Sequence, residues 1–277
     1  MPGFTLAFAM LAGLLADASL ARPSPDAIAS VGDLCTPPRD WAPPFTRLYH
    51  LRNGATLVFV ATLHTKDPRS ATHAQIKTAV AQYTPDTILV EAASADKSAS
   101  DAYLAFLATR AERQLADGHI QENLYAVTLA RERHVRYRGW DLSPNDEYVG
   151  DIAAGFDFRD AIGAHLLRAH VDPFGAPAPA ALDSELAAVP AARRPERFDY
   201  AAWYRAAYGP TFDPAAVTPC GTGVASAIVK AESVRRTQLL AAQIDATAKP
   251  GTVVLVEAGA NHWLALRAYL ASIALPK

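Results

Sequence analysis

The sequence predicts an α/β fold with a mostly parallel central sheet, helices on both faces and an insertion over the carboxyl edge of the sheet. Residues 57–60 (LVFV) and 88–90 (ILV) form unbroken apolar runs, which is typical of parallel strands that are covered on both faces. Apolar residues recur at helical spacing over 72–83, and Pro85 ends that pattern. A further apolar run at 252–256 precedes a final helical segment. Together the first three segments predict one βαβ unit.

Length and composition indicate a globular chain. It has 277 residues, 51% of them hydrophobic, and a formal net charge of −2. These values favour a single α/β domain over 47–277 with an insertion at about 142–220, and they give no sign of disorder. Basic residues and aromatic residues do not interleave in a stripe, so we expect no nucleic-acid partner. The sequence leaves the oligomeric state open.

Residues 1–22 predict a cleaved signal peptide. Their apolar core, 4–16, is too short to span a bilayer comfortably and leads into small residues near the end of the segment. We therefore expect a periplasmic or secreted protein with no stable membrane span after cleavage. The segment lacks a positive n-region, and the alternative is a misassigned start or a buried helix.

Residues 23–46 are rich in proline and lack periodicity, which predicts an extended arm. Cys35 in this arm and Cys220 are the two cysteines of the chain. In an exported protein they favour one disulfide, while two separate buried thiols are the alternative, because spacing alone does not give connectivity.

The pair Asn53-Gly54 predicts a hairpin that leads into the strand at Ala55. Within the insertion, proline and alanine are dense over 173–195 and an aromatic run follows at 200–209. We interpret the insertion as a lid or substrate wall, or as a packing subdomain with a small core of its own. The other predicted elements are helices over 101–117 and 120–132, a strand over 134–140, a helix from 221 to 248 and a final helix that contains Trp263, Leu266, Leu270 and Ile273.

Ionisable residues stand where three of the predicted strands end. His64 follows the first apolar run, Glu91 ends the second, and His262 follows the last. Parallel strands deliver their carboxyl ends to one edge of a sheet, which is where open α/β sheets hold ligands. Two imidazoles and a carboxylate can bind a divalent transition metal and leave positions open for water. We therefore predict that these three residues share a catalytic or metal site.

Other residues are weaker candidates. Asp67 could orient the His64 imidazole, although a helix cap is its ordinary role. Asp141 ends the strand over 134–140 and could be a further ligand or hydrogen-bond acceptor, while Glu257 could compete for the role of Glu91. Glu232 precedes two arginines on one helix, which predicts an ion pair with one of them at i+3 or i+4.

Four segments in this order resemble the TraB/GumN/PrgY and Tiki superfamily, and more distantly the erythromycin esterase and ChaN proteins. They are ATLH (61–64), ILVE (88–91), an E-x-x-R-R segment (232–236) and GANH (259–262). The family pattern has two G-x-x-H motifs, a glutamate at a strand end and an arginine on the helix before the last strand. Ala61 departs from it, because a glycine usually stands there.

The resemblance implies roles for single residues. The two motif histidines correspond to His64 and His262, the acid to Glu91, and the helix arginine to Arg235 or Arg236. Because Tiki proteins are described as metal-dependent proteases, the resemblance implies a hydrolase whose divalent transition metal is held by the two histidines and the glutamate. The arginine would then meet developing negative charge.

Three functions follow as hypotheses. The first is an exported metal-dependent hydrolase that cleaves a peptide or ester bond in a peptide or small-molecule substrate. The second is a periplasmic protein that binds or sequesters a haem-like, peptide or signalling ligand. The third is a metal-free, esterase-like hydrolase in which a histidine activates water.

Overall fold

The computed structural model describes residues 28, 35, 41–217 and 220–276, and within this part of the chain the fold is α/β, as predicted. In the described residues, five strands form one sheet in the order β1-β2-β5-β3-β4, in which β1 is antiparallel and every other pairing is parallel. The strands are β1 (Phe45–His50), β2 (Thr56–Thr62), β3 (Thr87–Ser94), β4 (Arg136–Asp141) and β5 (Val253–Gly259). The predicted signal peptide, residues 1–22, and most of the predicted arm lie outside the described residues.

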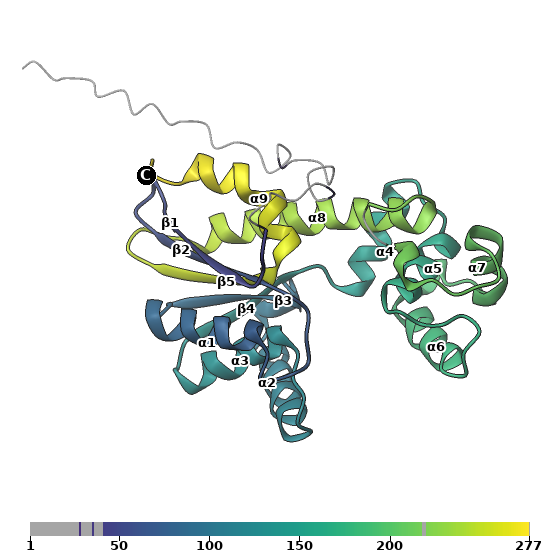
Figure 1. The fold of residues 1–277 in the computed structure, drawn as a ribbon, viewed down its shortest axis with the longest axis horizontal. Coiled ribbons are helices and arrows are strands. Elements are labelled where there is room, and N and C mark those ends of the chain that lie inside the picture. The colour runs from purple at the N-terminus through teal and green to yellow at the C-terminus, as the bar shows by residue number, and fades with distance from the viewer. Residues whose placement is uncertain (1–27, 29–34, 36–40, 218–219, 277) are drawn as a thin grey trace, which may run out of the picture.

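Helices cover both faces of the sheet (Figure 1). One face carries α1 (Ala71–Tyr83), α2 (Asp101–Ala116) and α3 (Glu122–Glu132), and the other carries α8 (Val224–Thr247) and α9 (Ala260–Ile273). Each face buries its own apolar core, because alternate residues of the strands point to opposite sides. The strands are accordingly apolar on both faces, which explains their unbroken hydrophobic runs.

The hairpin predicted at Asn53-Gly54 joins β1 to β2. Gly54 has a φ of +84°, and the Asn53 side chain donates to the Ala248 carbonyl oxygen at 2.8 Å, which ties the turn to the end of α8. Strand β1 begins at Phe45, inside the segment assigned to the arm, because Phe45 already pairs with Ala61. The last two residues of the segment assigned to the arm therefore belong to the sheet.

The predicted βαβ unit, β2-α1-β3, is present, but its two strands do not pair with each other. Strand β5, which comes last in the chain, lies between them and is parallel to both. The carboxyl ends of β2, β5 and β3 therefore stand side by side at one edge of the sheet.

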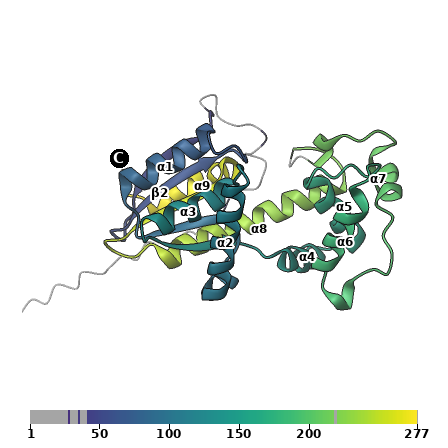
Figure 2. The same cartoon turned by 90° about the horizontal axis from the view of Figure 1, so that it is seen from below.

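The insertion forms a helical lobe beyond this carboxyl edge (Figures 1 and 2). Its helices are α4 (Pro144–Ala153), α5 (Phe158–Arg168), α6 (Ala178–Ala188) and α7 (Tyr200–Tyr208). We call residues 144–217 the insertion lobe. It has apolar clusters of its own around Ile162 and Tyr204, as a packing subdomain would have, and the first turns of α8 complete the cluster around Tyr204. Because α8 runs on from the lobe to the sheet, one helix links the two parts.

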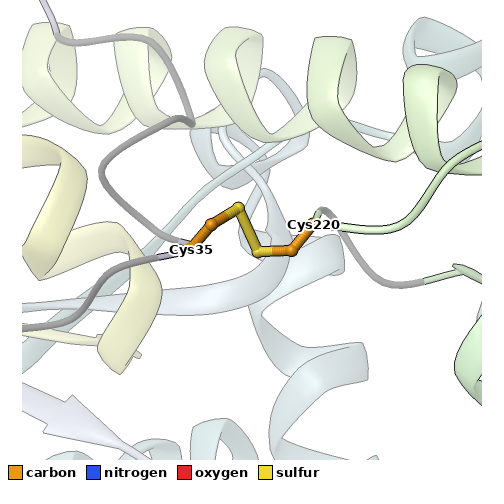
Figure 3. Close-up of a disulfide and its surroundings, with 2 residues drawn as sticks. All are labelled: Cys35 and Cys220. Carbon is orange, nitrogen blue, oxygen red and sulfur yellow. A yellow bond between two sulfur atoms is a disulfide. The ribbon is translucent and has the colours of Figure 1, made fainter.

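A disulfide joins Cys35 to Cys220, with a distance of 5.4 Å between the Cα atoms (Figure 3). It closes a span of 185 residues and connects the N-terminal arm to the segment before α8. Of the two alternatives for these cysteines, the structure has the bridge. Among the described helices, none is both long and apolar enough to cross a membrane.

Candidate functional site

His64, Glu91 and His262 line a single cavity of about 650 Å³ at the carboxyl edge of the sheet. We call it the strand-end cavity. Its other walls include Trp41 of the arm and Arg168 of the insertion lobe. The lobe therefore contributes to a wall of this cavity in addition to packing on itself.

Glu91 is the buried anion of this cavity, with 3% of its surface exposed. It lies on β3 where regular pairing with β4 is interrupted, next to Ala92, whose φ of +52° is unusual for a residue with a side chain. Its Oε2 accepts a hydrogen bond from the Gly259 backbone N–H at 2.5 Å. Burial by itself would raise the pKa of Glu91, but His262 and Arg236 outweigh it and hold that pKa well below its usual value.

Arg236 braces Glu91 from α8. It donates to Glu91 Oε1 at 2.7 Å and, through two nitrogens, to both carboxylate oxygens of Asp141 at 2.7 Å. Asp141 also accepts from the Ala92 backbone N–H at 3.0 Å, so it fixes both the arginine and the bend beside Glu91. Of the two candidate arginines, only Arg236 lies here. Arg235 turns to Asp151 in the insertion lobe, at 2.5 Å.

His262 is the third residue of α9 and presents Nε2 to the cavity. Its Nδ1 lies 2.9 Å from Thr237 Oγ1, and that hydroxyl donates its hydrogen to the Ser233 carbonyl oxygen at 2.7 Å. Nδ1 must therefore carry the hydrogen and donate to Thr237. A neutral His262 thus has an unprotonated Nε2, which lies 3.4 Å from Glu91 Oε1. At this distance a protonated Nε2 would donate to Glu91 directly, and with a neutral imidazole a shared water or cation could contact both atoms.

His64 lies two residues beyond β2 and is held by Glu122, the first residue of α3. Its Nδ1 is 2.5 Å from Glu122 Oε1, while Glu122 Oε2 accepts from the Thr65 backbone N–H at 3.1 Å. The hydrogen bond to Glu122 is the main reason why the pKa of His64 is raised to about 9. The His64 side chain remains 72% exposed, so an imidazolium faces the cavity at neutral pH.

Gly259 lies beside both His64 and Glu91. A Cβ atom on Gly259 would lie 3.3 Å from Glu91 Oε2, which is tight, and 3.5 Å from His64 Nε2, which is an ordinary contact, so the absence of a side chain mainly favours the close approach of Glu91. The first motif has Ala61 instead, which is fully buried within β2 and points away from solvent. The departure from glycine at Ala61 therefore does not narrow the cavity.

Two of the weaker candidates have other roles. Asp67 is exposed and accepts from the Arg69 backbone N–H at 2.9 Å, whereas the Nδ1 of His64 contacts Glu122. Glu257 is fully buried: it accepts from Thr62 Oγ1 at 3.2 Å and from the Glu91 backbone N–H at 3.1 Å. Burial and the neighbouring charge of Glu91 raise the pKa of Glu257 well above its usual value, which favours its protonated form.

Glu232 does not pair with the arginines that follow it, contrary to the helical-spacing prediction. It is buried and instead contacts His165 Nε2 at 2.5 Å and the guanidinium of Arg168. The reason is that α8 has the insertion lobe packed against this turn, and the lobe supplies closer partners. Sequence reasoning did not single out His165, because its partners lie 14 to 67 positions away along the chain.

Asp151, His165 and Glu232 form a buried group that can hold a metal ion, since one ligand atom from each lies within 4.8 Å of the others. Burial would lower the pKa of His165, but the carboxylates of Asp151, Glu185 and Glu232 raise it to about 11. Among the described residues, His64, Glu91 and His262 do not make such a group. Of these three, His262 and Glu91 approach at 3.4 Å, while the Nδ1 of His64 contacts Glu122.

Comparison with protein-family models, with curated proteins and with solved structures gives no match to this chain. The resemblance to the TraB/GumN/PrgY and Tiki superfamily therefore stays a prediction.

Proposed function

We propose that this chain is an exported hydrolase that cleaves a peptide or ester bond in the strand-end cavity. The observation that carries the proposal is the meeting of His64, Glu91 and His262 in one cavity, although they come from three distant parts of the chain. Groups that are far apart in sequence and meet at the ligand-binding edge of an α/β sheet favour a shared chemical role.

His262 is suited to activate water. The hydrogen bond to Thr237 places the proton on Nδ1 and leaves the Nε2 lone pair directed into the cavity. A water in the cavity that contacts both Nε2 and Glu91 Oε1 would give its proton to the imidazole as it attacks the carbonyl carbon. The negative charge of Glu91 would then stabilise the imidazolium that forms, in the way a carboxylate supports a catalytic histidine.

His64 is suited to the opposite task. Its raised pKa of about 9 keeps it protonated at neutral pH, so it can hydrogen-bond a developing oxyanion or protonate the leaving group. Arg236 is already bonded to Glu91 and Asp141, so its role is to fix the carboxylate rather than to contact substrate.

A divalent metal in this cavity would be held by His64, Glu91 and His262 and would supply Lewis-acid activation of water. The donor types fit, and the Glu122 carboxylate on Nδ1 of His64 is a typical partner of a metal-ligating histidine. The spacing does not fit, because these ligand atoms do not gather within 4.8 Å. The steps above therefore use only residues of the chain.

The disulfide supports export. Bridges between distant cysteines form and persist in oxidising compartments such as the periplasm or the extracellular space. Cys35 lies shortly after the predicted signal peptide, and its partner Cys220 precedes α8. Cleavage within residues 1–22, measured by mass spectrometry of the mature protein, tests this part of the proposal.

A binding protein is the second candidate, and one observation favours it. The charged groups of the cavity are already paired inside the protein: His64 with Glu122, Arg236 with Asp141, and Arg168 with Glu147. Because partners inside the protein compensate the charges that line it, the cavity suits a ligand that is bound and not chemically changed. Such a protein would bind ligand but show no turnover.

Hydrolysis of a panel of peptides and activated esters by the mature chain tests the first proposal. We expect turnover that falls by about 10²- to 10⁴-fold in His64→Ala, the usual contribution of a general acid or base, and survives a chelator. His50→Ala is the matched control, because His50 is exposed and pairs with Thr56 at the opposite edge of the sheet. Unchanged turnover in His64→Ala rejects the proposal. Turnover that the chelator abolishes would show that the hydrolysis depends on a bound metal ion.

A further inference from the structure

We propose that the insertion lobe contains a site for one divalent transition-metal ion of the zinc class, held by His165 Nε2, Asp151 Oδ2 and Glu232 Oε1. The ligands come from α4, α5 and α8, and Glu185 on α6 supports the imidazole. We call these four residues the lobe cluster. This inference does not rest on the proposed hydrolase activity.

The first observation is an unsatisfied buried acceptor. His165 Nε2 carries a single hydrogen, which can bond to Glu232 Oε1 at 2.5 Å. Asp151 Oδ2 lies 3.4 Å from the same nitrogen, is fully buried, and has no hydrogen-bond partner among the described residues. Buried carboxylate oxygens are normally paired, because leaving one unpaired is costly. A cation in place of the proton would contact both oxygens and the nitrogen.

The second observation is the way the imidazole is oriented. Nδ1 of His165 lies 3.0 Å from Glu185 Oε1, and the Tyr148 hydroxyl donates to that same oxygen at 2.8 Å. A carboxylate on the far nitrogen is the usual partner of a metal-ligating histidine, because it fixes the tautomer and the ring plane. The Tyr148 ring, itself fully buried, lies 4.4 Å from the His165 ring and shields it from water.

The third observation is that the two oxygens of each ligand carboxylate face different cationic groups. Glu232 gives Oε2 to Arg168, and Asp151 gives Oδ1 to Arg235 at 2.5 Å. Their other oxygens both face His165 Nε2. The guanidiniums therefore occupy the outer oxygens and position the inner ones, which leaves the inner oxygens for a shared ion.

The charges of this region also favour a divalent ion. Four carboxylates (Asp151, Glu147, Glu185, Glu232) surround two guanidiniums (Arg168, Arg235) and His165. With His165 protonated, one negative charge remains in excess. With a neutral imidazole and a doubly charged ion, the charges cancel. Near-neutrality matters here, because an uncompensated charge is costly in a buried site.

The distances are compatible with a shared ion after a small movement. Bonds of about 2.1 Å at tetrahedral angles place ligand atoms about 3.4 Å apart. His165 Nε2 and Asp151 Oδ2 are already 3.4 Å apart. Glu232 Oε1 would withdraw by about 1 Å from its hydrogen bond to His165. One imidazole nitrogen with carboxylate oxygens suits Zn²⁺ and its neighbours in the first row.

Such an ion would have a structural consequence for the strand-end cavity. Arg168 bonds to Glu232 in the lobe cluster and also lines that cavity. Fixing Glu232 on an ion would therefore fix Arg168, and with it one wall of the cavity. The ion would join α4 and α5 of the lobe to α8, the helix that continues to the sheet.

Titration of the full mature chain with Zn²⁺, and separately with Co²⁺, tests the inference after chelator treatment and dialysis. We expect one equivalent to bind, with visible Co²⁺ absorption bands of a low-coordinate site. Asp151→Asn should weaken binding at least about 10- to 100-fold, the loss typical for a disturbed metal site. Asn keeps the shape of Asp151 and can still accept from Arg235. If that variant does not fold, as judged by circular dichroism, Glu185→Gln provides the same comparison.

The control is the double variant His64→Ala with His262→Ala, which removes both histidines of the predicted strand-end metal site. It should bind the ion as tightly as the parent chain. Absence of binding by the parent would overturn the inference and leave the lobe cluster as a proton-linked network of ion pairs. Binding that survives Asp151→Asn, or that disappears in the histidine double variant, would also overturn it.

Discussion

Replacing Arg236 by glutamine tests whether the buried ion pairs of Arg236 with Glu91 and Asp141 stabilise the strand-end cavity. Arg236 is the group that compensates both Glu91 and Asp141, and the side chains of these two acids are each 5% exposed. Glutamine has no charge and cannot reach both partners. The substitution therefore leaves two buried carboxylates close together without the guanidinium that they share. Removing one partner of a buried ion pair typically costs about 3–5 kcal/mol of unfolding free energy.

Urea denaturation of Arg236→Gln at pH 7 measures this cost. The matched control is Arg69→Gln, because Arg69 is exposed and its ion pair with Asp67 lies in solvent, so we expect no measurable change. The pKa of Glu91 is lowered in the folded protein, so its contribution is present above its usual value of 4.5 and is lost as the pH falls through the folded pKa. The difference between parent and Arg236→Gln should therefore narrow below about pH 4. A loss of less than about 1 kcal/mol of unfolding free energy at pH 7 would refute the stabilising role of these ion pairs.

Three further predictions concern single groups. The imidazole of His64 should titrate near pH 9 by NMR, and Glu122→Gln should return its pKa toward the usual 6.5; an unchanged pKa would refute the role of Glu122. Glu257→Gln should leave the unfolding free energy at pH 7 equal or higher. The reason is that the pKa of Glu257 is raised in the folded protein, so this acid lowers the stability of the fold as the pH rises above its usual 4.5. Marked destabilisation in urea would contradict the raised pKa of Glu257. Replacing Cys35 and Cys220 by serine should cost about 2–5 kcal/mol in the same assay, and no loss would show that the bridge is not stabilising.

The strand ends were predictable from sequence because one rule governs them. Parallel strands that are buried on both faces appear as apolar runs, and the residues just after such runs lie at one edge. His64, Glu91 and His262 all follow this rule, and the structure brings them to one cavity. The order of strands was not predictable in the same way. Strand β5 enters the sheet between β2 and β3, and nothing in the local sequence specifies its neighbours.

The partners of these residues were harder to predict. Glu122 holds His64, but in sequence it is only an acid in the first turn of a helix, where acids are common because of the helix dipole. Glu232 was expected to pair along its own helix, and a tertiary contact with His165 replaced that local pair. His165 itself lies in a segment whose helices are short and weakly patterned. Its surroundings depend on how four helices pack, and sequence spacing does not encode that arrangement.

The central claim, that two histidines from opposite ends of the chain act in one hydrolytic site, is tested most directly by a double-mutant cycle on turnover. The cycle compares His64→Gln, His262→Gln and the double variant on one cleaved substrate. Residues that act together in one step give strongly non-additive losses. We predict that the turnover of the double variant is about equal to that of the slower single variant. Losses that multiply, or either single variant with unchanged turnover, would contradict it.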